Sequence, residues 1–509
     1  MNIIINCDRI LQVAGFVLVA CIFDMVYFDV YIEVRNTMSF NSIEYAIFLP
    51  IVFLVYWSIP HRFRWILLLV ASYFFYMSWN PKYVVLILGT TIVSYISAIL
   101  LDRTESASRK KIILFLASLI CLGVLFLFKY FNFISESIAY VCGRLAIPLH
   151  PVTLQVLLPV GISFYTFQTL SYVIDVYKGK VKAERHFGQY ATFISFFPQL
   201  VAGPIERPAN LLPQIKSPKI FYYPLAMCGA KQILWGLFKK IAIADVVSGY
   251  VDKGYNNLPF CTEFDLLFIV LMFSVQIYCD FSGYSDIAIG TAKLFGINLM
   301  TNFSSPYLSL SVKEFWSRWH ISLSSWFKDY LYIPLGGNRC TRLRNYFNIL
   351  VTFLISGLWH GANWTFVCWG GIHGVAQVLE KIFGFSPKKE SICSKVIHWA
   401  LVFTFCNIAW VFFRAESLGD AIFIVQNLKF ILYAPTSYIG LSKFICLYLL
   451  VSISIVFVFD YISLKQDVIA LLQRKSNITN LAFLYMLIAF ILFGLNNSIG
   501  SNQFVYFQF

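Results

Sequence analysis

The chain has 509 residues, of which 59% are hydrophobic and 13% are charged. Its mean hydropathy of +0.72 excludes a water-soluble fold, because no such fold needs that much apolar surface. The 39 Lys and Arg residues outnumber the 25 Asp and Glu residues, but they form short clusters between apolar runs. That pattern indicates membrane topology and argues against nucleic-acid binding.

Apolar stretches recur from Ile51 almost to the C-terminus, and about 20 such residues cross a bilayer as a helix. Backbone groups in hydrocarbon must pair within the protein, which leaves helical bundles and closed barrels. The stretch at residues 266–278 lacks the period-two alternation of a barrel strand. We therefore expect an all-α polytopic membrane protein.

The N-terminal residues 1–37 contain an apolar run, residues 10–30, that is interrupted by Asp24. This part is either an extra helix or uncleaved anchor, or it precedes a true start at Met38, and both alternatives stay open. We expect residues 38–509 to form a single membrane domain.

Helices are next expected at residues 65–79 and 83–101, joined by a turn at Asn80-Pro81. Basic clusters flank this pair, so both clusters are assigned to the cytoplasmic face. Residues 112–128 then cross outward, and a broken segment at residues 154–177 returns.

Residues 311–330 are expected to form surface helices, because tryptophans alternate there with basic residues as at a membrane interface. Residues 421–433 are expected at the outer interface, and residues 481–495 then leave the tail outside. The loops assigned to the cytoplasm in this half are residues 339–344, 381–395 and 465–475.

The twelve cysteines are scattered singly, so neither a disulfide framework nor a zinc site is expected. The common nucleophile, phosphate-loop and metal motifs are absent, and we expect no metal and no bound cofactor. Asp280 and Asp286 lie in an apolar context, where buried carboxylates would orient neighbouring polar groups.

His360 lies between Gly357 and Gly361 in an apolar region, which places an ionisable ring at membrane depth. Such residues usually serve a function, yet an imidazole also bonds helices together, and position alone leaves both interpretations open. Taken alone, His320 and His373 are expected to be structural, with His373 packed between small residues.

Four motifs then identify a family. They are FPQLVAGPIER at residues 197–207, residues 276–290, RWHISLSSWFKDYLYIPLGGNR at residues 318–339, and GLWHGANW at residues 357–364. From about Met38 to Phe509 the sequence resembles the membrane-bound O-acyltransferase family, and more closely its alginate O-acetylation branch.

The resemblance implies a ring of tilted helices around a thinned centre, where cytoplasmic and extracytoplasmic funnels meet at a catalytic histidine. His360 matches that residue and His320 matches its supporting histidine. The resemblance also implies a bacterial inner-membrane enzyme that takes acetyl from cytoplasmic acetyl-CoA and works with an extracytoplasmic acyl-transfer protein.

The chemistry expected of the site is general-base catalysis, in which a neutral imidazole takes a proton from an attacking hydroxyl. A desolvated histidine stays neutral more readily. Asn363 is a candidate for stabilising the oxyanion or orienting the ring. Tyr506, in the aromatic tail, is a candidate acyl relay, although such a tail is more often an interfacial anchor.

The expected function is O-acetylation of an extracytoplasmic polysaccharide such as alginate. The alternatives are D-alanyl transfer to teichoic acid and peptidoglycan O-acetylation. From a different class, a polysaccharide transporter would expect broken helices with paired charges at the midplane.

Overall fold

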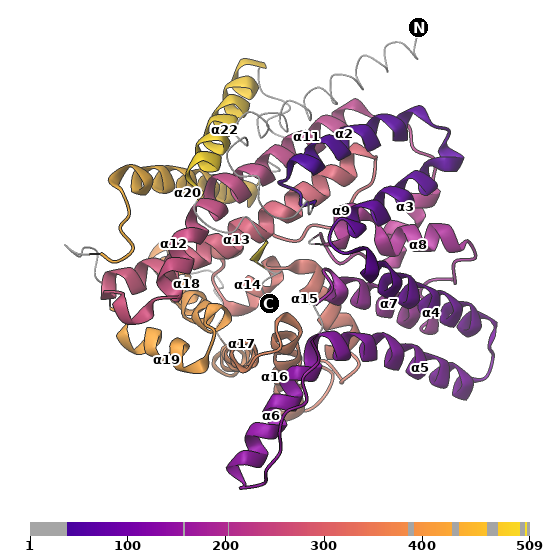
Figure 1. Cartoon of the computed structure of the whole chain (residues 1–509), viewed down its shortest axis with the longest axis horizontal. Helices are drawn as coiled ribbons and strands as arrows, with labels where there is room; N and C mark the ends of the chain where they lie inside the picture. Colours follow the sequence, from indigo (N-terminus) through magenta and orange to yellow (C-terminus); the bar gives the residue numbers. More distant parts are fainter. Residues whose placement is uncertain are drawn as a thin grey trace. The chain divides into compact units, whose positions relative to one another are not determined.

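The computed structural model describes residues 38–155, 158–201, 203–384, 391–429, 437–465, 477–498 and 504–505. This part of the chain is helical and contains no β-strand (Figure 1), which confirms the all-α class. The expected extension at residues 1–37 lies outside the described residues. The single-domain expectation stays a prediction.

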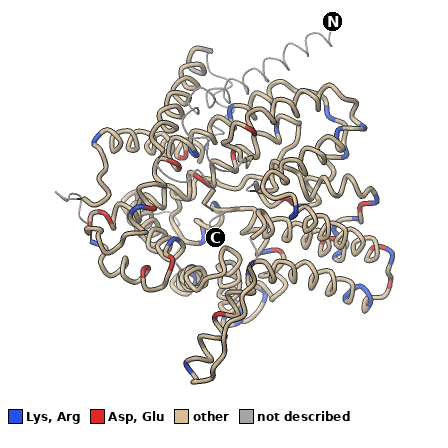
Figure 2. Tube along the Cα trace, viewed as in Figure 1, with Lys and Arg blue, Asp and Glu red and all other residues tan. Residues whose placement is uncertain are grey.

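Within the described part, five helices are long and apolar enough to cross a membrane. Lys and Arg residues gather at helix ends and in connections (Figure 2), as the positive loops of a membrane protein require. The polytopic membrane class is therefore confirmed. The five helices are Pro81–Arg103, Ala107–Arg144, Glu263–Leu294, Ile392–Arg414 and Lys443–Ser463, and shorter apolar helices are Ile43–Ser58 and Leu481–Asn497.

The helix expected at residues 112–128 is longer in the structure. It continues through a π-helical turn, Phe126–Tyr130, and ends at Arg144. The sequence becomes more polar after Phe128 but contains no proline there, so nothing interrupts the main-chain hydrogen bonds. The broken segment at residues 154–177 becomes a regular helix only after Gly161, whose φ is 75°.

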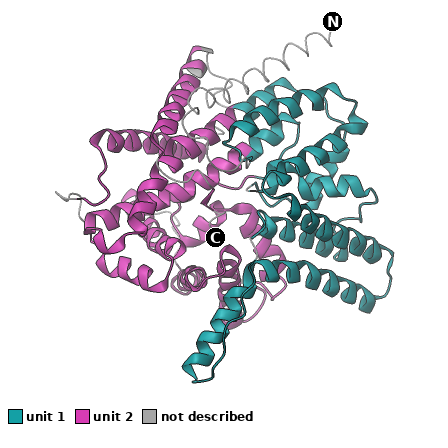
Figure 3. Ribbon diagram, in the orientation of Figure 1, with its two compact units in different colours: residues 1–230, 288–300 teal, residues 231–287, 301–509 magenta. Residues whose placement is uncertain are grey.

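Two compact units divide the chain (Figure 3), and unit 1 contains the residues up to Ala230 together with Ala288–Met300. In unit 1, α4 packs against α5 and α7, and α3 packs against α8. Its helices are α2 (Ile43–Ser58), α3 (His61–Met77), α4 (Val84–Arg103), α5 (Ala107–Leu125), α6 (Phe131–Arg144), α7 (Ile162–Tyr177), α8 (Phe187–Ser195), α9 (Phe197–Leu200), α10 (Pro208–Lys216) and most of α11 (Tyr223–Leu237).

Unit 2 contains Lys231–Ile287 and Thr301–Phe509, and with them both candidate histidines. Its elements are the π-helix η4 (Phe238–Asp245), α12 (Val246–Tyr255), most of α13 (Glu263–Leu294), α14 (Val312–Arg318), α15 (Ile321–Phe327), the π-helical turn η7 (Lys328–Tyr332), α16 (Arg342–His360), α17 (Trp364–Phe383), α18 (Ile392–Arg414), α19 (Leu418–Asn427), α20 (Lys443–Ser463) and α22 (Asn477–Asn497).

Helices α16 and α17 touch through two glycines. A Cβ atom on Gly370 would lie 2.3 Å from the carbonyl oxygen of Phe353, and one on Gly357 would lie 2.3 Å from that of Phe366. Small residues allow helix backbones to approach closely, and this is how membrane helices commonly associate. The contact brings the C-terminal end of α16, which carries His360, against the first turns of α17.

The expectation of surface helices at residues 311–330 is wrong. The segment breaks at His320, between α14 and α15, and the side chains of Trp316, Trp319 and Trp326 are 7%, 0% and 7% exposed. Aromatic and basic residues alternate in either setting, so the pattern could not separate an interfacial helix from a folded-in one. In the structure Trp319 packs on Phe315 and other rings of unit 2.

We predict that Gly370→Ala destabilises the protein by about 1–3 kcal/mol, because the new methyl group must push α16 away from α17. Gly371→Ala is the matched control, since its Cβ would lie 3.5 Å from the side chain of Leu354, an ordinary contact. Thermal melting of the detergent-solubilised protein measures both. Equal melting temperatures for the two variants would contradict the close contact.

Candidate active site

His360 is the last residue of α16 and is buried, with 3% of its surface exposed. The next residue must be small, because a Cβ on Gly361 would lie 2.1 Å from the ring of Phe366. Three aromatic rings surround the imidazole: the centroids of Trp369, Trp359 and Phe413 lie 4.9, 5.0 and 5.4 Å from it. The ring is thus enclosed by residues of α16, α17 and α18.

His320 interrupts the chain between α14 and α15 in a left-handed conformation, with φ 44° and ψ 53°. It is fully buried. A non-glycine residue with positive φ is strained, and such strain persists where the surroundings hold the residue in place. A continuous helix would have carried its side chain elsewhere, so the break sets the position of this imidazole.

Asn302 is the residue that holds His320. Its Oδ1 lies 3.0 Å from Nδ1 of His320 and accepts a hydrogen bond of 2.9 Å from the hydroxyl of Ser322. Its Nδ2 donates to the hydroxyl of Ser285 on α13 at 3.1 Å. The main chains of the two segments are also joined, because the N–H of Ile321 donates to the carbonyl of Asn302 at 2.9 Å.

This network assigns the tautomer of His320. The main-chain N–H of Ser322 can only donate, and it lies 3.4 Å from Oδ1 of Asn302, so Oδ1 is the acceptor and Nδ1 of His320 carries the proton. Nε2 then carries the lone pair. Burial lowers the pKa of His320 to about 3, so the imidazole is neutral at every physiological pH.

The structure brings the two histidines together, although they are forty positions apart in the sequence. Their ring centroids lie 6.5 Å apart. The edge of Phe281 packs on His320 at 4.6 Å between centroids, and Trp359 lies 6.2 Å from it. Both rings therefore occupy one buried aromatic site within unit 2.

The structure does not place the two other predicted site residues, Asn363 and Tyr506, as it places the histidines. Asn363 is the N-cap of α17: its Oδ1 accepts from the N–H of Thr365 at 3.1 Å, and its Nδ2 donates to the carbonyl of Glu416 at 3.1 Å. These bonds give its amide a structural task, and its expected catalytic role stays a prediction. Tyr506 lies outside the described residues.

His373 is not packed between small residues, as the sequence suggested. Aromatic rings surround it, and its Nδ1 accepts a hydrogen bond of 3.1 Å from the indole of Trp316. Trp369 lies between His373 and His360, 5.1 and 4.9 Å from the two rings. The glycines near His373 in the sequence face α16 and do not surround its ring. The prediction that His373 packs between small residues is therefore wrong.

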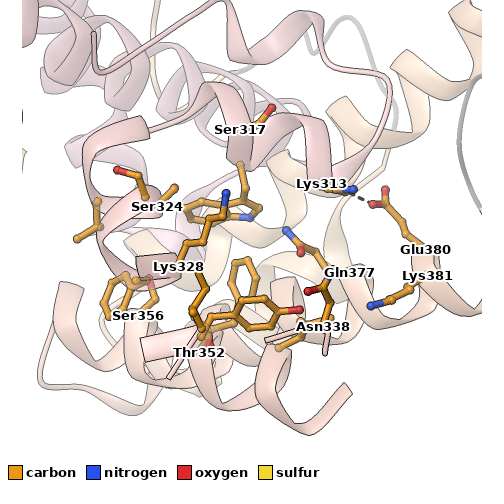
Figure 4. A pocket seen from close by; sticks show the side chains of 18 of the residues that line it. Lys313, Ser317, Ser324, Lys328, Asn338, Thr352, Ser356, Gln377, Glu380 and Lys381 are labelled. Carbon is orange, nitrogen blue, oxygen red and sulfur yellow. Dashed lines mark hydrogen bonds between the residues drawn. The ribbon is translucent and has the colours of Figure 1, made fainter. Parts of the chain in front are cut away.

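Unit 2 also contains a cavity of about 820 Å³ (Figure 4). It is lined by residues of α14, α15, η7, α16 and α17. Its wall includes Ile321, which follows His320, and Ser356, one helical turn before His360. Lys313, Lys328 and Lys381 line it together with one carboxylate, Glu380, so this mainly apolar cavity carries a net positive charge (Figure 4). Among the described residues, no group of three His, Cys, Asp or Glu side chains forms a metal site.

Comparison with known proteins identifies the family. Residues 183–418, which include both histidines, match the model of the membrane-bound O-acyltransferase family, MBOAT. A probable alginate O-acetylase, AlgI, of Pseudomonas syringae pv. tomato is 41% identical over 75% of this chain and 74% of its own length. A peptidoglycan O-acetyltransferase of Helicobacter pylori is 37% identical over 75% and 77%.

The chain belongs to the membrane-bound O-acyltransferase family. It is therefore a bacterial integral membrane O-acyltransferase, and the resemblance drawn from its motifs is confirmed. A more distant relative, a teichoic acid D-alanyltransferase of Streptococcus thermophilus, is 29% identical over 46% of this chain and 58% of its own length. The motifs located both histidines of this acyltransferase but not Asn302, which the sequence shows only as one asparagine in a loop.

We predict that Asn302→Leu lowers the turnover number for acyl transfer about tenfold or more with little change in KM, because His320 loses the partner that fixes its ring. Asn302→Asp keeps the acceptor oxygen and should retain more activity. Ser322→Ala removes a neighbouring bond to the same oxygen without touching His320, and we expect at most a twofold effect. A folded Asn302→Leu variant with full turnover would contradict this role.

Proposed function

We propose that this O-acyltransferase moves acetyl groups from cytoplasmic acetyl-CoA to hydroxyl groups of an extracytoplasmic polysaccharide of the alginate type. The observation that carries the proposal is the pair of buried imidazoles, His320 and His360, with centroids 6.5 Å apart. The similarity to probable alginate O-acetylases over three quarters of the chain supports the substrate class.

In the proposed reaction His360 is the general base. Its imidazole takes the proton of the acceptor hydroxyl as the oxygen attacks the carbonyl carbon of the thioester. The C–S bond breaks, the acetyl group forms an ester with the acceptor, and the proton passes from His360 to the departing thiolate. The aromatic rings around His360 support this role, because they exclude water that would otherwise hydrolyse the thioester.

The proposed role of His320 is to support His360 and the substrate. Its proton is fixed on Nδ1 by Asn302, so it stays neutral and keeps one orientation. A preorganised neighbour costs no reorganisation when charge develops in the transition state. Asn363 remains a candidate for the same task, although its amide already caps α17.

The cavity beside α16 is the proposed entrance for the donor. Its lining combines apolar side chains with Lys313 and Lys328, which suits a donor with an extended arm and a phosphate-bearing end. Asn338 and Lys381 also line it, and they lie at the loops that the positive-inside rule assigns to the cytoplasm. Acetyl-CoA would act here as a substrate, and no bound cofactor is part of the proposal.

The outer half of the reaction is proposed to involve the tail and a partner. Tyr506 would accept the acetyl group as a phenyl ester, with His360 as its base, and hand it to a separate extracytoplasmic acyl-transfer protein. The support is local: residues 504–505 are buried in unit 2, against the α13 residue Phe281 that packs on His320.

Peptidoglycan is the second candidate acceptor, because the Helicobacter pylori peptidoglycan O-acetyltransferase matches about as much of this chain as the alginate O-acetylases do. Teichoic acid D-alanylation has weaker support, since that relative covers less than half of the chain. Loss of acetyl esters from one polymer after gene deletion identifies the acceptor. A transporter has no support among relatives that are acyltransferases.

We predict that His360→Ala lowers acetyl transfer by about 10²–10⁴-fold, the usual contribution of a general base. The protein should remain folded and keep its affinity for the donor. Release of labelled acetyl from acetyl-CoA by purified protein, with size-exclusion chromatography as the folding check, measures this. His398→Ala, on α18, is the control and should behave as the unsubstituted protein. Full transfer by a folded His360→Ala variant would refute the proposal.

We predict that Lys328→Ala raises KM for acetyl-CoA about five- to tenfold and leaves kcat unchanged, because the exposed ammonium attracts phosphate but takes no part in bond breaking. Lys111→Ala, on α5 and outside the cavity, is the matched loss of one charge. If only a charged carrier protein, and not acetyl-CoA, supports transfer, the donor assignment is wrong. An unchanged KM in Lys328→Ala would place the donor elsewhere.

A further inference from the structure

Unit 2 contains a buried ion cluster that neither histidine explains. Nζ of Lys240 lies 2.7 Å from Oδ1 of Asp245 and 2.7 Å from Oδ1 of Asp280. The three side chains are 1%, 4% and 1% exposed. Removing charges from water is costly, so a fully buried cluster in a membrane protein calls for an explanation beyond packing.

Local geometry builds the cluster. Lys240 and Asp245 both lie in η4, a π-helix, whose hydrogen bonds join residues five apart and so place these two side chains one turn apart. Asp280 lies on α13, one turn before Gly283, where a Cβ would lie 2.8 Å from the carbonyl oxygen of Gly236. That close backbone contact brings α13 within reach of Lys240.

Lys240 shares its one positive charge between two carboxylates. Asp280 can therefore accept a further hydrogen bond through its second oxygen. That donor is the main chain of the C-terminal segment: the N–H of Val505 donates to Oδ2 of Asp280 at 2.7 Å. Asp280 thus binds Lys240 through one oxygen and the tail through the other. A hydrogen bond to a charged acceptor is stronger than one between neutral groups.

An aromatic contact accompanies the main-chain bond. Phe504 is fully buried, and its ring centroid lies 4.5 Å from Tyr284 and 5.5 Å from Phe281. Tyr284 also carries Lys240 over its ring at 5.4 Å. Phe281 in turn packs edge-on against His320. The ion cluster, the tail and the active site are therefore neighbours in one packed group of side chains.

We propose that Asp280, oriented by Lys240, is the docking point of the C-terminal segment. It binds the main chain of Val505 and seats Phe504 on Tyr284 and on Phe281, which packs against His320. Asp280 is a positioning residue. Its consequence for acyl transfer rests on the proposed function of Tyr506, but the docking itself does not.

Two substitutions test the docking from opposite sides. Asp280→Leu removes the acceptor and leaves Lys240 paired with Asp245, so no buried charge is left alone. Val505→Pro removes the N–H donor and leaves the whole ion cluster intact. The matched control is Asp286→Asn on the same helix, whose carboxylate pairs with Lys239 at 2.5 Å.

The measurement is hydrogen–deuterium exchange of the full-length protein in detergent, followed at the amides of the C-terminal peptide other than that of residue 505, because Val505→Pro has no N–H there. We expect exchange at least tenfold faster in Asp280→Leu and Val505→Pro than in the unsubstituted protein and in Asp286→Asn. Peptides from α16 and α17 should exchange as before, which shows that the fold persists. Unchanged exchange in a folded Val505→Pro variant would overturn the docking, even if Asp280→Leu fails to fold.

A third variant separates this inference from the proposed function. Tyr506→Phe removes only a hydroxyl, so the tail should exchange as in the unsubstituted protein while acetyl transfer is lost. Normal transfer by Tyr506→Phe would end the acyl relay but leave the docking standing. Fast exchange in Asp280→Leu together with normal acetyl transfer would show that Asp280 docks the tail and that acetyl transfer does not need this docking.

Discussion

The hydrogen bond between Asn302 and His320 is the interaction on which the active site depends. It joins a loop to a helix break, fixes the proton on one ring nitrogen and holds a strained backbone in place. The break separates α14 from α15, and the tryptophans of these two helices, Trp316 and Trp326, are buried. The ring centroid of His320, at the break, lies 6.5 Å from that of His360.

Much of the architecture follows from the sequence, because hydrocarbon solvent allows few backbone arrangements. The apolar runs located helices long enough to span, such as Pro81–Arg103, but the crossing expected at residues 65–79 forms α3, which is not among the five. The motifs contained both histidines. The break at His320 could not be foreseen, because it depends on Asn302 and Ser285, which are distant in sequence. The burial of Lys239 and Lys240 in η4 could not be predicted for the same reason. In the sequence they are an ordinary basic pair, and the carboxylates that pair with them lie on α13.

An acyl-transfer site in a membrane must exclude water and must hold its catalytic groups close together, and unit 2 has features that serve both needs. Bulky aromatic rings keep water from the imidazoles, while glycines on α16 and α17 bring the helix that carries His360 close to its neighbours. The buried Lys240 is paired with carboxylates, and the exposed Lys328 lines the cavity. The cavity proposed for the donor is lined by Ile321 and Ser356, near the two histidines in the sequence, and Phe504 packs on Phe281, which contacts His320.

The central claim is that one imidazole serves a thioester from the cell interior and a hydroxyl from the exterior. The most direct test uses sealed right-side-out membrane vesicles that are loaded with radiolabelled acetyl-CoA and given polysaccharide outside together with the extracytoplasmic acyl-transfer protein. The account predicts labelled esters on the external polymer, and none when His360 is replaced by alanine. Label that appears only when donor and polymer share one side of the membrane would contradict it.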